Sequence, residues 1–421
     1  MMTYKVRLAN SLILIFLTGC SSLAPLLSTP TPVPVVESTV TPQPIPTSTI
    51  PAESTSTTLR VWLPPQFDPA NGTVSAELLT QRLKDFEADH SDLEIEIRIK
   101  GGNTDIVEFL SVTNSAAPTT MPDLVALSYD ELQSAASAGF LHPLGGLTNL
   151  LQDPDWYAFA RELGTVQNAG YGIPFAADAM MTVYRSSVFE LPPTDWESIV
   201  NSGSHILFPA SDSQHYFPLA LYLSLNGRFA NEQGSFALDE DVFVQVLSLF
   251  QSAYESGALP LDIRDFQTDV QSLNSYSNGE ADLAVVWASS DIGVNSGSYT
   301  ALLGLNDAPF TIGDGWTWAL AGSNAENQPL TVELASYLVE SEYMSEWSYV
   351  SGYLPTRPLA LNGWADEASK EGLDDVLLAS HPIPSPEKVS MFGPIMQEAL
   401  IRIFNGEQAE IVAGSVVESL K

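Results

Sequence analysis

The sequence has few cysteines and few basic residues. Cys20 is the single cysteine among 421 residues, so no disulfide can form within the chain. Only 16 lysines and arginines accompany 51 aspartates and glutamates, which gives a formal net charge of -35. A surface that is this acidic repels phosphate backbones, and we therefore exclude nucleic acid as a partner.

Motifs for metal binding and catalysis are also missing from the sequence. The five histidines are scattered, without the spacing of metal ligands. There is no Gly-x-Ser-x-Gly, no phosphate-binding loop that ends in Gly-Lys-Ser/Thr, and no His-Glu-x-x-His. We predict a protein that is not an enzyme and uses no metal and no cofactor. With 51 acidic residues, the carboxylate pair of a glycosidase stays open as an alternative.

The first 20 residues predict an export signal. Lys5 and Arg7 give a basic start, residues 11–17 a short apolar segment, and Leu17-Thr-Gly-Cys20 closes the signal. The apolar segment is too short to be a persuasive membrane-spanning helix. The arrangement resembles the signal of bacterial lipoproteins, in which the cysteine is lipidated and becomes the mature N-terminus. The resemblance implies a lipid anchor at Cys20 that holds the protein on the extracytoplasmic side of the cell membrane.

Residues 21–58 predict a disordered tether. They consist mainly of Pro, Ser and Thr, a composition that buries too little apolar surface to fold and favours extended polyproline II. At roughly 3.1 Å per residue, such a segment would reach on the order of 100 Å. We interpret it as a spacer between the lipid anchor and the folded protein; an unselected low-complexity stretch is the alternative.

Apolar periodicities from residue 59 onward alternate between those of strands and helices. Strands are expected at 59–63, 93–99, 123–127, 205–208 and 281–287, and helices around 79–86, 130–139, 195–200, 216–225, 239–256 and 330–338. This alternation predicts an α/β fold with a mainly parallel sheet that is covered on both faces. Because ligands bind at the carboxyl ends of such strands, Trp62, Asn103 and Tyr129 are expected on one rim.

Residues 170–189 predict a hinge between two such α/β units. Two apolar runs, 173–177 and 180–184, are separated by one acidic residue, Asp178. Pro174 prevents helix formation, and the aromatic and β-branched content favours extended structure. A few extended residues between two units can absorb the backbone rotation of closure.

Three segments in order carry a resemblance to a known family. Residues 171–175 read Tyr-Gly-Ile-Pro-Phe, residues 313–319 read Gly-Asp-Gly-Trp-Thr-Trp-Ala, and residues 352–357 read Gly-Tyr-Leu-Pro-Thr-Arg. They resemble the interlobe crossings of bacterial extracellular solute-binding proteins of the sugar-binding, ABC-importer type (family 1, maltose-binding-protein-like). The usual Asn-Lys-Asp after the first crossing is replaced near Arg185.

The resemblance implies a type II, periplasmic-binding-protein-like fold. Its two α/β lobes would each have a mainly parallel sheet flanked by helices, and a hinge would join them. Residues 59–177 and 314–345 would form the first lobe, and residues 178–313 and 346–421 the second.

A carbohydrate site needs flat aromatic surfaces for the sugar faces and polar side chains for the hydroxyls. The residues that the predicted loops and crossings bring to such a site are Trp62, Asn103, Tyr129, Asp178, Trp287, Asp314, Trp316, Tyr353 and Arg357.

Several of these assignments have a structural alternative. Trp287 fits the cleft and the core equally well, and Asp178 would also pair with Arg185. Arg357 would instead lock the third crossing by ion pairing. Of Trp316 and Trp318, one is expected in the cleft and the other in the core, and we choose Trp316 for the cleft.

We predict that the protein is a monomer that captures a mono- or oligosaccharide in the cleft by hinge closure. It would then deliver the sugar to the membrane subunits of an ABC importer. A different solute, such as a polyamine or a peptide, is the first alternative. A surface glycan hydrolase is the second, and a sensor or adhesin that no longer works with an importer is the third.

Overall fold

The computed structural model describes residues 57–102, 104–294 and 296–420. The predicted signal peptide, Cys20, the tether up to residue 56 and the candidate Asn103 lie outside the described residues. The tether was expected to run to residue 58, but Thr57 and Thr58 pair with Leu93 and Glu94 in the first strand pair. No described helix combines the length and the hydrophobicity that crossing a bilayer requires.

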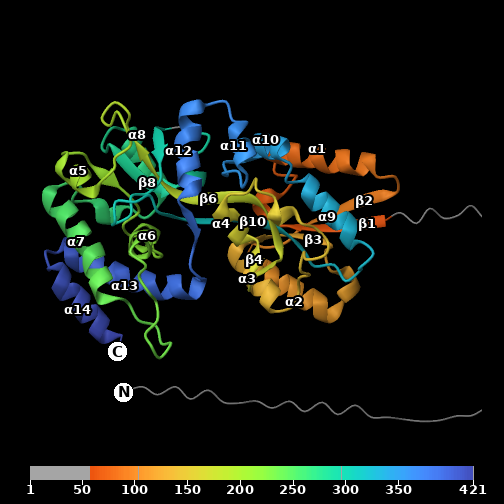
Figure 1. Cartoon of the computed structure of the whole chain (residues 1–421), viewed down its shortest axis with the longest axis horizontal. Helices are drawn as coiled ribbons and strands as arrows, with labels where there is room; N and C mark the ends of the chain where they lie inside the picture. The colour runs from red at the N-terminus through yellow and green to blue at the C-terminus, as the bar shows by residue number, and fades with distance from the viewer. Residues whose placement is uncertain (1–56, 103, 295, 421) are drawn as a thin grey trace, which may run out of the picture. The chain divides into compact units, whose positions relative to one another are not determined.

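The strands and helices alternate along most of the chain (Figure 1). The strands are β1 (Thr57–Leu63), β2 (Leu93–Ile99), β3 (Leu124–Ser128), β4 (Thr165–Val166), β5 (Ala169–Gly170), β6 (Gly172–Tyr184), β7 (Ile206–Leu207), β8 (Leu283–Trp287), β9 (Ser298–Thr300), β10 (Thr311–Leu320) and β11 (Ser380–Pro382). The α-helices are α1 (Val74–Asp89), α2 (Ile106–Ala116), α3 (Tyr129–Ser137), α4 (Ala158–Leu163), α5 (Trp196–Asn201), α6 (Tyr216–Ser224), α7 (Glu240–Ser256), α8 (Asp269–Ser277), α9 (Gln328–Tyr337), α10 (Ser341–Ser351), α11 (Pro358–Asn362), α12 (Glu367–Leu378), α13 (Pro386–Phe404) and α14 (Ala409–Ser419).

One sheet connects two α/β lobes. Its strand order is β2-β1-β3-β10-β6-β8-β7, with β11 beside β10 and β9 beside β6. The pairs β1–β2, β1–β3, β7–β8 and β10–β11 are parallel, whereas β10 and β6 run antiparallel to their main neighbours. We call the part built on β1, β2 and β3 the first lobe and the part built on β7, β8 and β9 the second lobe.

The crossing between the lobes is a single long strand, β6. Its first part, from Gly172 to Ala179, pairs with β10, and its last part, from Met180 to Tyr184, pairs with β8. The two apolar runs of the sequence are thus one continuous strand, and Asp178 lies beside the point at which the partner changes. A bridge between Ala177 and Leu354 brings the third predicted crossing to the same place.

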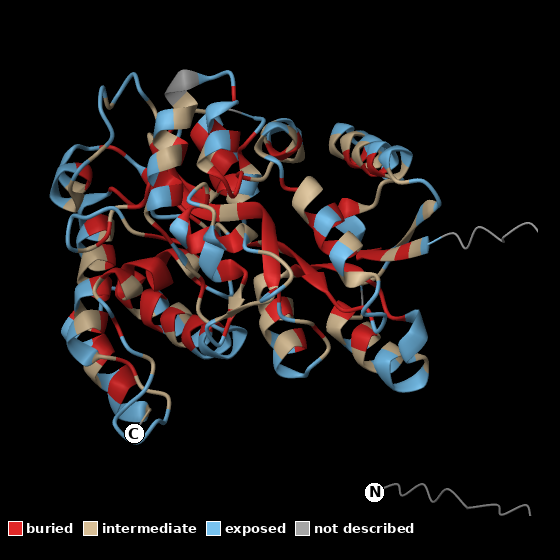
Figure 2. Ribbon diagram, turned by 45° about the vertical axis from the view of Figure 1, so that its right-hand side comes forward, coloured by how far each residue is buried: buried red, intermediate tan, exposed pale blue. Residues whose placement is uncertain are grey.

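Helices cover both faces of the sheet in each lobe, as the alternating side chains require. In the first lobe, α1, α9 and α10 pack on one face and α2 and α3 on the other. In the second lobe, α6, α7, α13 and α14 pack on one face and α4, α8 and α12 on the other. Figure 2 shows the central strands almost wholly buried and most of the outer helices exposed on one side.

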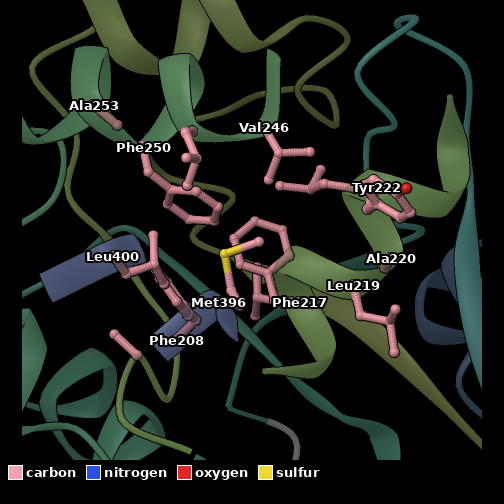
Figure 3. Close-up of a cluster of buried hydrophobic side chains, with 14 of the residues drawn as sticks. Phe208, Phe217, Leu219, Ala220, Tyr222, Val246, Phe250, Ala253, Met396 and Leu400 are labelled. Atoms are coloured by element: carbon pink, nitrogen blue, oxygen red, sulfur yellow. The ribbon is translucent and has the colours of Figure 1, made fainter. Parts of the chain in front are cut away.

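The second lobe has an aromatic core. The rings of Phe208 and Phe217 lie 5.0 Å apart, those of Phe208 and Phe250 lie 5.4 Å apart, and Met396 lies beside them (Figure 3). Burial of each such side chain stabilises the fold by about 1.5–3 kcal/mol. This core anchors α6, whose first residue reaches the site described below.

Helix α10 shows how chain segments are shared between the lobes. Met344 and Trp347 of α10, and Ala360 of α11, pack in the same core cluster as Leu59 and Val61 of β1. This packing extends first-lobe contacts beyond residue 345. The division of the chain at the proposed boundaries stays a prediction.

Candidate functional site

A cavity lies where β6 and β10 cross from one lobe to the other. Its volume is about 300 Å³, and we call it the crossing cavity. Its lining comes from β6, β8, β10, the first turns of α6 and α8, and the loops after β8 and α10: Asp178, Tyr216, Asp269, Trp287, Ser289, Ser290, Asp314, Gly315, Trp316 and Tyr353. A second cavity of about 220 Å³ shares Tyr216, Asp269 and Trp287 with it, and we call it the adjoining cavity.

Two carboxylates lie opposite each other in the crossing cavity. Asp178 of β6 and Asp314 of β10 are direct partners in the antiparallel register. Asp178 accepts hydrogen bonds from the backbone N–H groups of Ala179, at 2.9 Å, and Ser289, at 3.0 Å, and from the Ser289 hydroxyl. Asp314 accepts one, from the backbone N–H of Gly315 at 2.7 Å. Like charges directly opposite on neighbouring strands repel each other.

Burial and neighbouring carboxylates raise the pKa of both groups. Burial, with a contribution from the Asp314 carboxylate and against the hydrogen bonds from Ser289, raises the pKa of Asp178 to about 7. Burial also raises the pKa of Asp314 to about 6, and Asp130 and Glu131 add to that shift. The two carboxylates thus prefer a proton or a positively charged partner.

Glycine on β10 lets the two crossing strands approach closely at the site. A Cβ atom added to Gly315 would lie 2.5 Å from the carbonyl oxygen of Ala176, which no side chain would tolerate. The sequence Gly313-Asp-Gly315 therefore places Asp314 as the one side chain between two positions that must stay bare. A register shift between Trp316 and Thr317 follows at once, opposite Pro174, which has no N–H to donate to the ladder.

A third carboxylate enters the cavity at the start of α8. Thr268 and Gln271 form a capping box, in which each side chain accepts a hydrogen bond from the other's backbone N–H. This fixes Asp269 in the first turn, where it accepts hydrogen bonds from the Trp287 backbone N–H, at 3.0 Å, and the Ser290 hydroxyl, at 2.9 Å. Burial raises the pKa of Asp269, against these hydrogen bonds.

Aromatic rings from both lobes form the walls of the cavity. On the second-lobe side, Trp287 meets Tyr216 edge to face, with ring centroids 5.2 Å apart. On the first-lobe side, Trp316 packs edge to face against Phe67, also at 5.2 Å, and Phe67 in turn contacts Tyr353. Because Trp287, Trp316 and Tyr353 are all half-buried, each combines fixed packing with surface that a ligand can cover.

Five of the nine predicted binding residues line this one cavity: Asp178, Trp287, Asp314, Trp316 and Tyr353. Tyr129 lies close to it without lining it. Tyr129 directly follows Ser128, which is the strand partner of Trp316. Burial raises the pKa of Tyr129, and the charges of Asp130, Glu162 and Asp314 raise it as well. Asp178 hydrogen bonds to Ser289 and not to Arg185, whose guanidinium donates to backbone carbonyl groups of Tyr276 and Ala281.

Trp62 and Arg357 lie elsewhere. Trp62 was expected on the rim, but it is 2% exposed and belongs to the core under α2 and α3, because its alternation along β1 turns it toward those helices. Arg357 is 8% exposed and donates hydrogen bonds to Asp153, at 2.8 Å, and Asp155, at 3.0 Å. Its guanidinium also lies 4.7 Å from the ring centre of Trp156. The two ion pairs hold Arg357 in the third crossing and away from the cavity.

Trp316 and Trp318 lie on the same face of β10. Residues two apart on a strand share a face, and both rings pack against the same first-lobe core cluster. They differ in their position along β10. Trp318 stacks on Phe175 deep in the lobe, at 4.4 Å, whereas Trp316 lies nearer the crossing and reaches the cavity.

The sequence reasoning missed Tyr216, Asp269, Ser289 and Ser290. The capping pattern Thr268-Asp-Val-Gln271 was a readable signal for a helix start, and hence for the place of Asp269. Nothing local marks Tyr216 or the serine pair, because they reach the site only through long-range packing.

A larger cavity, of about 630 Å³, lies at another place in the first lobe. It is lined by residues 57–60, 119–123 and 323–327 in part, with short polar side chains such as Thr58, Ser323 and Asn324, and no aromatic ring. It lacks the flat apolar surfaces of the crossing cavity, which is the better candidate site.

Comparisons with known proteins agree with this arrangement. Residues 81–372 match the family of bacterial extracellular solute-binding proteins. Comparison of the sequence with curated proteins gives no significant match.

Solved structures of similar fold cover most of the chain. The sugar-binding protein MalE of the phytopathogen Xanthomonas citri is 17% identical with a TM-score of 0.70, over 86% of this chain and 96% of its own. The cyclic α-maltosyl-1,6-maltose binding protein of Arthrobacter globiformis is 17% identical with a TM-score of 0.65, over 86% and 98%. An ABC transporter solute-binding protein of Thermotoga lettingae, bound with α-D-tagatose, is 17% identical with a TM-score of 0.59, over 87% and 99%. At these identities the likeness shows the two-lobed α/β fold.

Proposed function

The chain belongs to the bacterial extracellular solute-binding proteins, and from that premise we propose that it binds a mono- or oligosaccharide in the crossing cavity. The observation that carries the proposal is the meeting of half-buried rings and carboxylates from both lobes in that cavity: Trp287 with Asp269, and Trp316 with Asp314. Similar structures named as binding maltose derivatives and tagatose support the same ligand class.

The chemistry of the cavity suits a sugar ring. Each aromatic face that covers the C–H surface of a sugar contributes about 0.5–1.5 kcal/mol beyond its buried area. Each hydrogen bond from a sugar hydroxyl to a carboxylate contributes about 1.5–3 kcal/mol. Two rings and three such hydrogen bonds contribute about 5.5–12 kcal/mol in all, a range that includes the roughly 8 kcal/mol of micromolar affinity.

Binding is coupled to hinge closure in this proposal. The lobes share β6 and β10, and the bridge between Ala177 and Leu354 adds a third connection at the same level. A ligand that touches Trp316 in one lobe and Trp287 in the other makes all its contacts only when the lobes are closed. Its differential affinity for that state then shifts the population toward it.

The remaining parts of the proposal concern where the protein works. Cys20 would carry the lipid anchor on the extracytoplasmic side of the cell membrane, and residues 21–56 would link it to the folded lobes. The closed lobes would dock on the membrane subunits of an ABC importer, as a monomer. Residues 59–177 with 314–345, and 178–313 with 346–421, are the proposed lobe divisions. No catalytic step is part of this function, and the bound sugar is released unchanged.

A thermal-shift screen of the purified protein against neutral sugars, amino sugars, polyamines, amino acids and short peptides tests the proposal. A ligand at 100 times its Kd stabilises the folded state by about 2.7 kcal/mol. We expect a saccharide to raise the Tm, and Trp316→Ala to abolish the shift. Tyr349→Ala removes an exposed ring from α10 outside the cavity and serves as the matched control. No shift with any saccharide, or chemical conversion of the sugar during incubation, would refute the proposal.

A further inference from the structure

We propose that the saccharide bound in the crossing cavity carries a protonated amine, which is seated against the carboxylates of Asp178, Asp269 and Asp314. This inference rests on the proposed function and narrows its substrate class to amino-substituted sugars. It follows from the charges that line the site and from the absence of any compensating group among them.

The first observation is the imbalance of charge. Asp178, Asp269 and Asp314 line the crossing cavity, and Asp212 joins Asp269 in the adjoining one. None of the described residues that line the two cavities is a lysine, an arginine or a histidine. Arg357, the arginine that the sequence suggested for this site, is occupied by Asp153 and Asp155.

The second observation is that buried carboxylates elsewhere in the chain are supplied with donors. Asp291 accepts hydrogen bonds from Ser296 and from the hydroxyl of Tyr299. Asp123 accepts from the backbone N–H of Arg60 and from the side-chain amide of Asn327. In both of these buried aspartates, each of the two carboxylate oxygens accepts a hydrogen bond.

Asp314 departs from that pattern. Its carboxylate accepts a single hydrogen bond, from Gly315, and among the described residues its second oxygen has no hydrogen-bond partner. Asp269 likewise uses one oxygen for both of its hydrogen bonds. An ionised carboxylate can accept about four hydrogen bonds, so Asp314 and Asp269, which both line the cavity, can each accept further hydrogen bonds from a ligand.

The third observation is the arrangement around the serine pair after β8. Ser289 donates to Asp178, and Ser290 donates to Asp269. Two consecutive serines thus hold the carboxylates of Asp178 and Asp269. Asp314 is the partner of Asp178 on the neighbouring strand β10. All three groups line the same cavity. The repulsion of the Asp178 carboxylate by that of Asp314 is relieved when a cation enters.

The aromatic walls fit the same ligand. A protonated amine is attracted to the faces of tryptophan and tyrosine rings, and Trp287, Trp316 and Tyr216 all line the crossing cavity. A neutral sugar would use the rings and donate hydroxyl hydrogen bonds, but it would bring no positive charge to the three carboxylates. An amino sugar uses both features at once.

The experiment compares matched saccharides by calorimetric titration of the purified protein. The probes are the glucosamine trimer, its fully N-acetylated counterpart, a neutral glucose trimer, and spermidine. We expect the glucosamine trimer to bind at least about tenfold more tightly than the two neutral trimers, in line with a hydrogen bond to a charged group. We expect added salt to weaken the binding of the glucosamine trimer more than the binding of the neutral trimers.

Asp314→Asn is the test variant, and Glu232→Gln, at an exposed position outside the cavities, is its control. Asp314→Asn is expected to weaken the glucosamine trimer more than the neutral trimers, because it removes one of the charges that face the amine, and so to lower the ratio of their affinities about tenfold. Neutral trimers that bind as tightly as the glucosamine trimer would overturn this inference and leave the proposed function standing. Spermidine binding without binding of any saccharide would overturn both.

Discussion

Replacing Asp178 by asparagine should stabilise the folded protein at high pH while weakening ligand binding. The asparagine oxygen can keep the hydrogen bonds from the backbone N–H groups of Ala179 and Ser289, which both go to the same carboxylate oxygen. The new amide group can donate to the Ser289 hydroxyl. The substitution therefore removes the charge opposite Asp314 and retains the contacts.

The size of the effect follows from the raised pKa of Asp178. The shift from 3.8 to about 7 corresponds to about 4 kcal/mol, at about 1.4 kcal/mol per pH unit. Because the side chain is half-buried and solvent screens part of the interaction, we expect about 2 kcal/mol. For a chain of this size, at about 2 cal/mol/K of unfolding entropy per residue, this is a Tm increase of about 3 °C.

The sign of the pH dependence is fixed by which state binds the proton. The folded state holds a proton on Asp178 up to about pH 7, whereas the unfolded chain loses it near pH 3.8. This group therefore contributes its full stability below pH 3.8 and loses it as the pH rises toward 7. Asp178→Asn should match the wild type at pH 4 and exceed it at pH 8.

Differential scanning calorimetry between pH 4 and pH 8, with Glu232→Gln as a control that should follow the wild type, measures this difference. A variant that is less stable than the wild type by the same amount at both pH values would refute the reasoning. It would mean that the ionised Asp178 carboxylate stabilises the fold and that its burial does not destabilise the folded state.

Three further predictions concern packing and the cavity wall. Arg357→Met should lower the free energy of unfolding by about 1–3 kcal/mol in urea titrations, because it removes the buried guanidinium that binds Asp153 and Asp155, and unchanged stability would contradict the ion-pair role. Gly372→Ala should destabilise by about 1–3 kcal/mol, because its Cβ would lie 2.1 Å from the Tyr299 carbonyl oxygen, whereas Gly414→Ala, with its nearest neighbour at 3.5 Å, should stabilise by about 0.5–1 kcal/mol. Trp287→Ala should reduce saccharide affinity about tenfold with little loss of stability, whereas Trp318→Ala should lower the free energy of unfolding by about 3–5 kcal/mol. Equal effects of the two substitutions would contradict the assignment of Trp287 to the cavity wall and of Trp318 to the core.

The sequence was sufficient for most elements and for the crossings. Leu79, Leu83 and Phe86 recur at helical spacing, and all three are buried on one face of α1. Asp178 is conspicuous in the sequence as an acid inside an apolar strand, and the structure places it in the lining of the crossing cavity. The order of the three crossing segments predicted the two-lobed fold.

The limits of the sequence lie where several positions look alike locally. Trp62, at a strand end, has the same apparent environment as Trp287, and only the covering helices α2 and α3 decide that it is buried. Arg357 follows a crossing as a ligand-binding arginine would, yet its partners Asp153 and Asp155 lie some 200 residues earlier, beyond the range of pattern reasoning. Tyr216 reaches the cavity because the second-lobe core fixes α6.

The most direct test of the account is a crystal structure of the protein grown with the saccharide that binds most tightly in the screen. We expect the sugar in the crossing cavity, with ring atoms within about 4 Å of Trp287 and Trp316 and a polar group on Asp314. A saccharide bound elsewhere, for example in the polar cavity beside Thr58 and Asn324, with the crossing cavity free of ligand, would contradict the central claim.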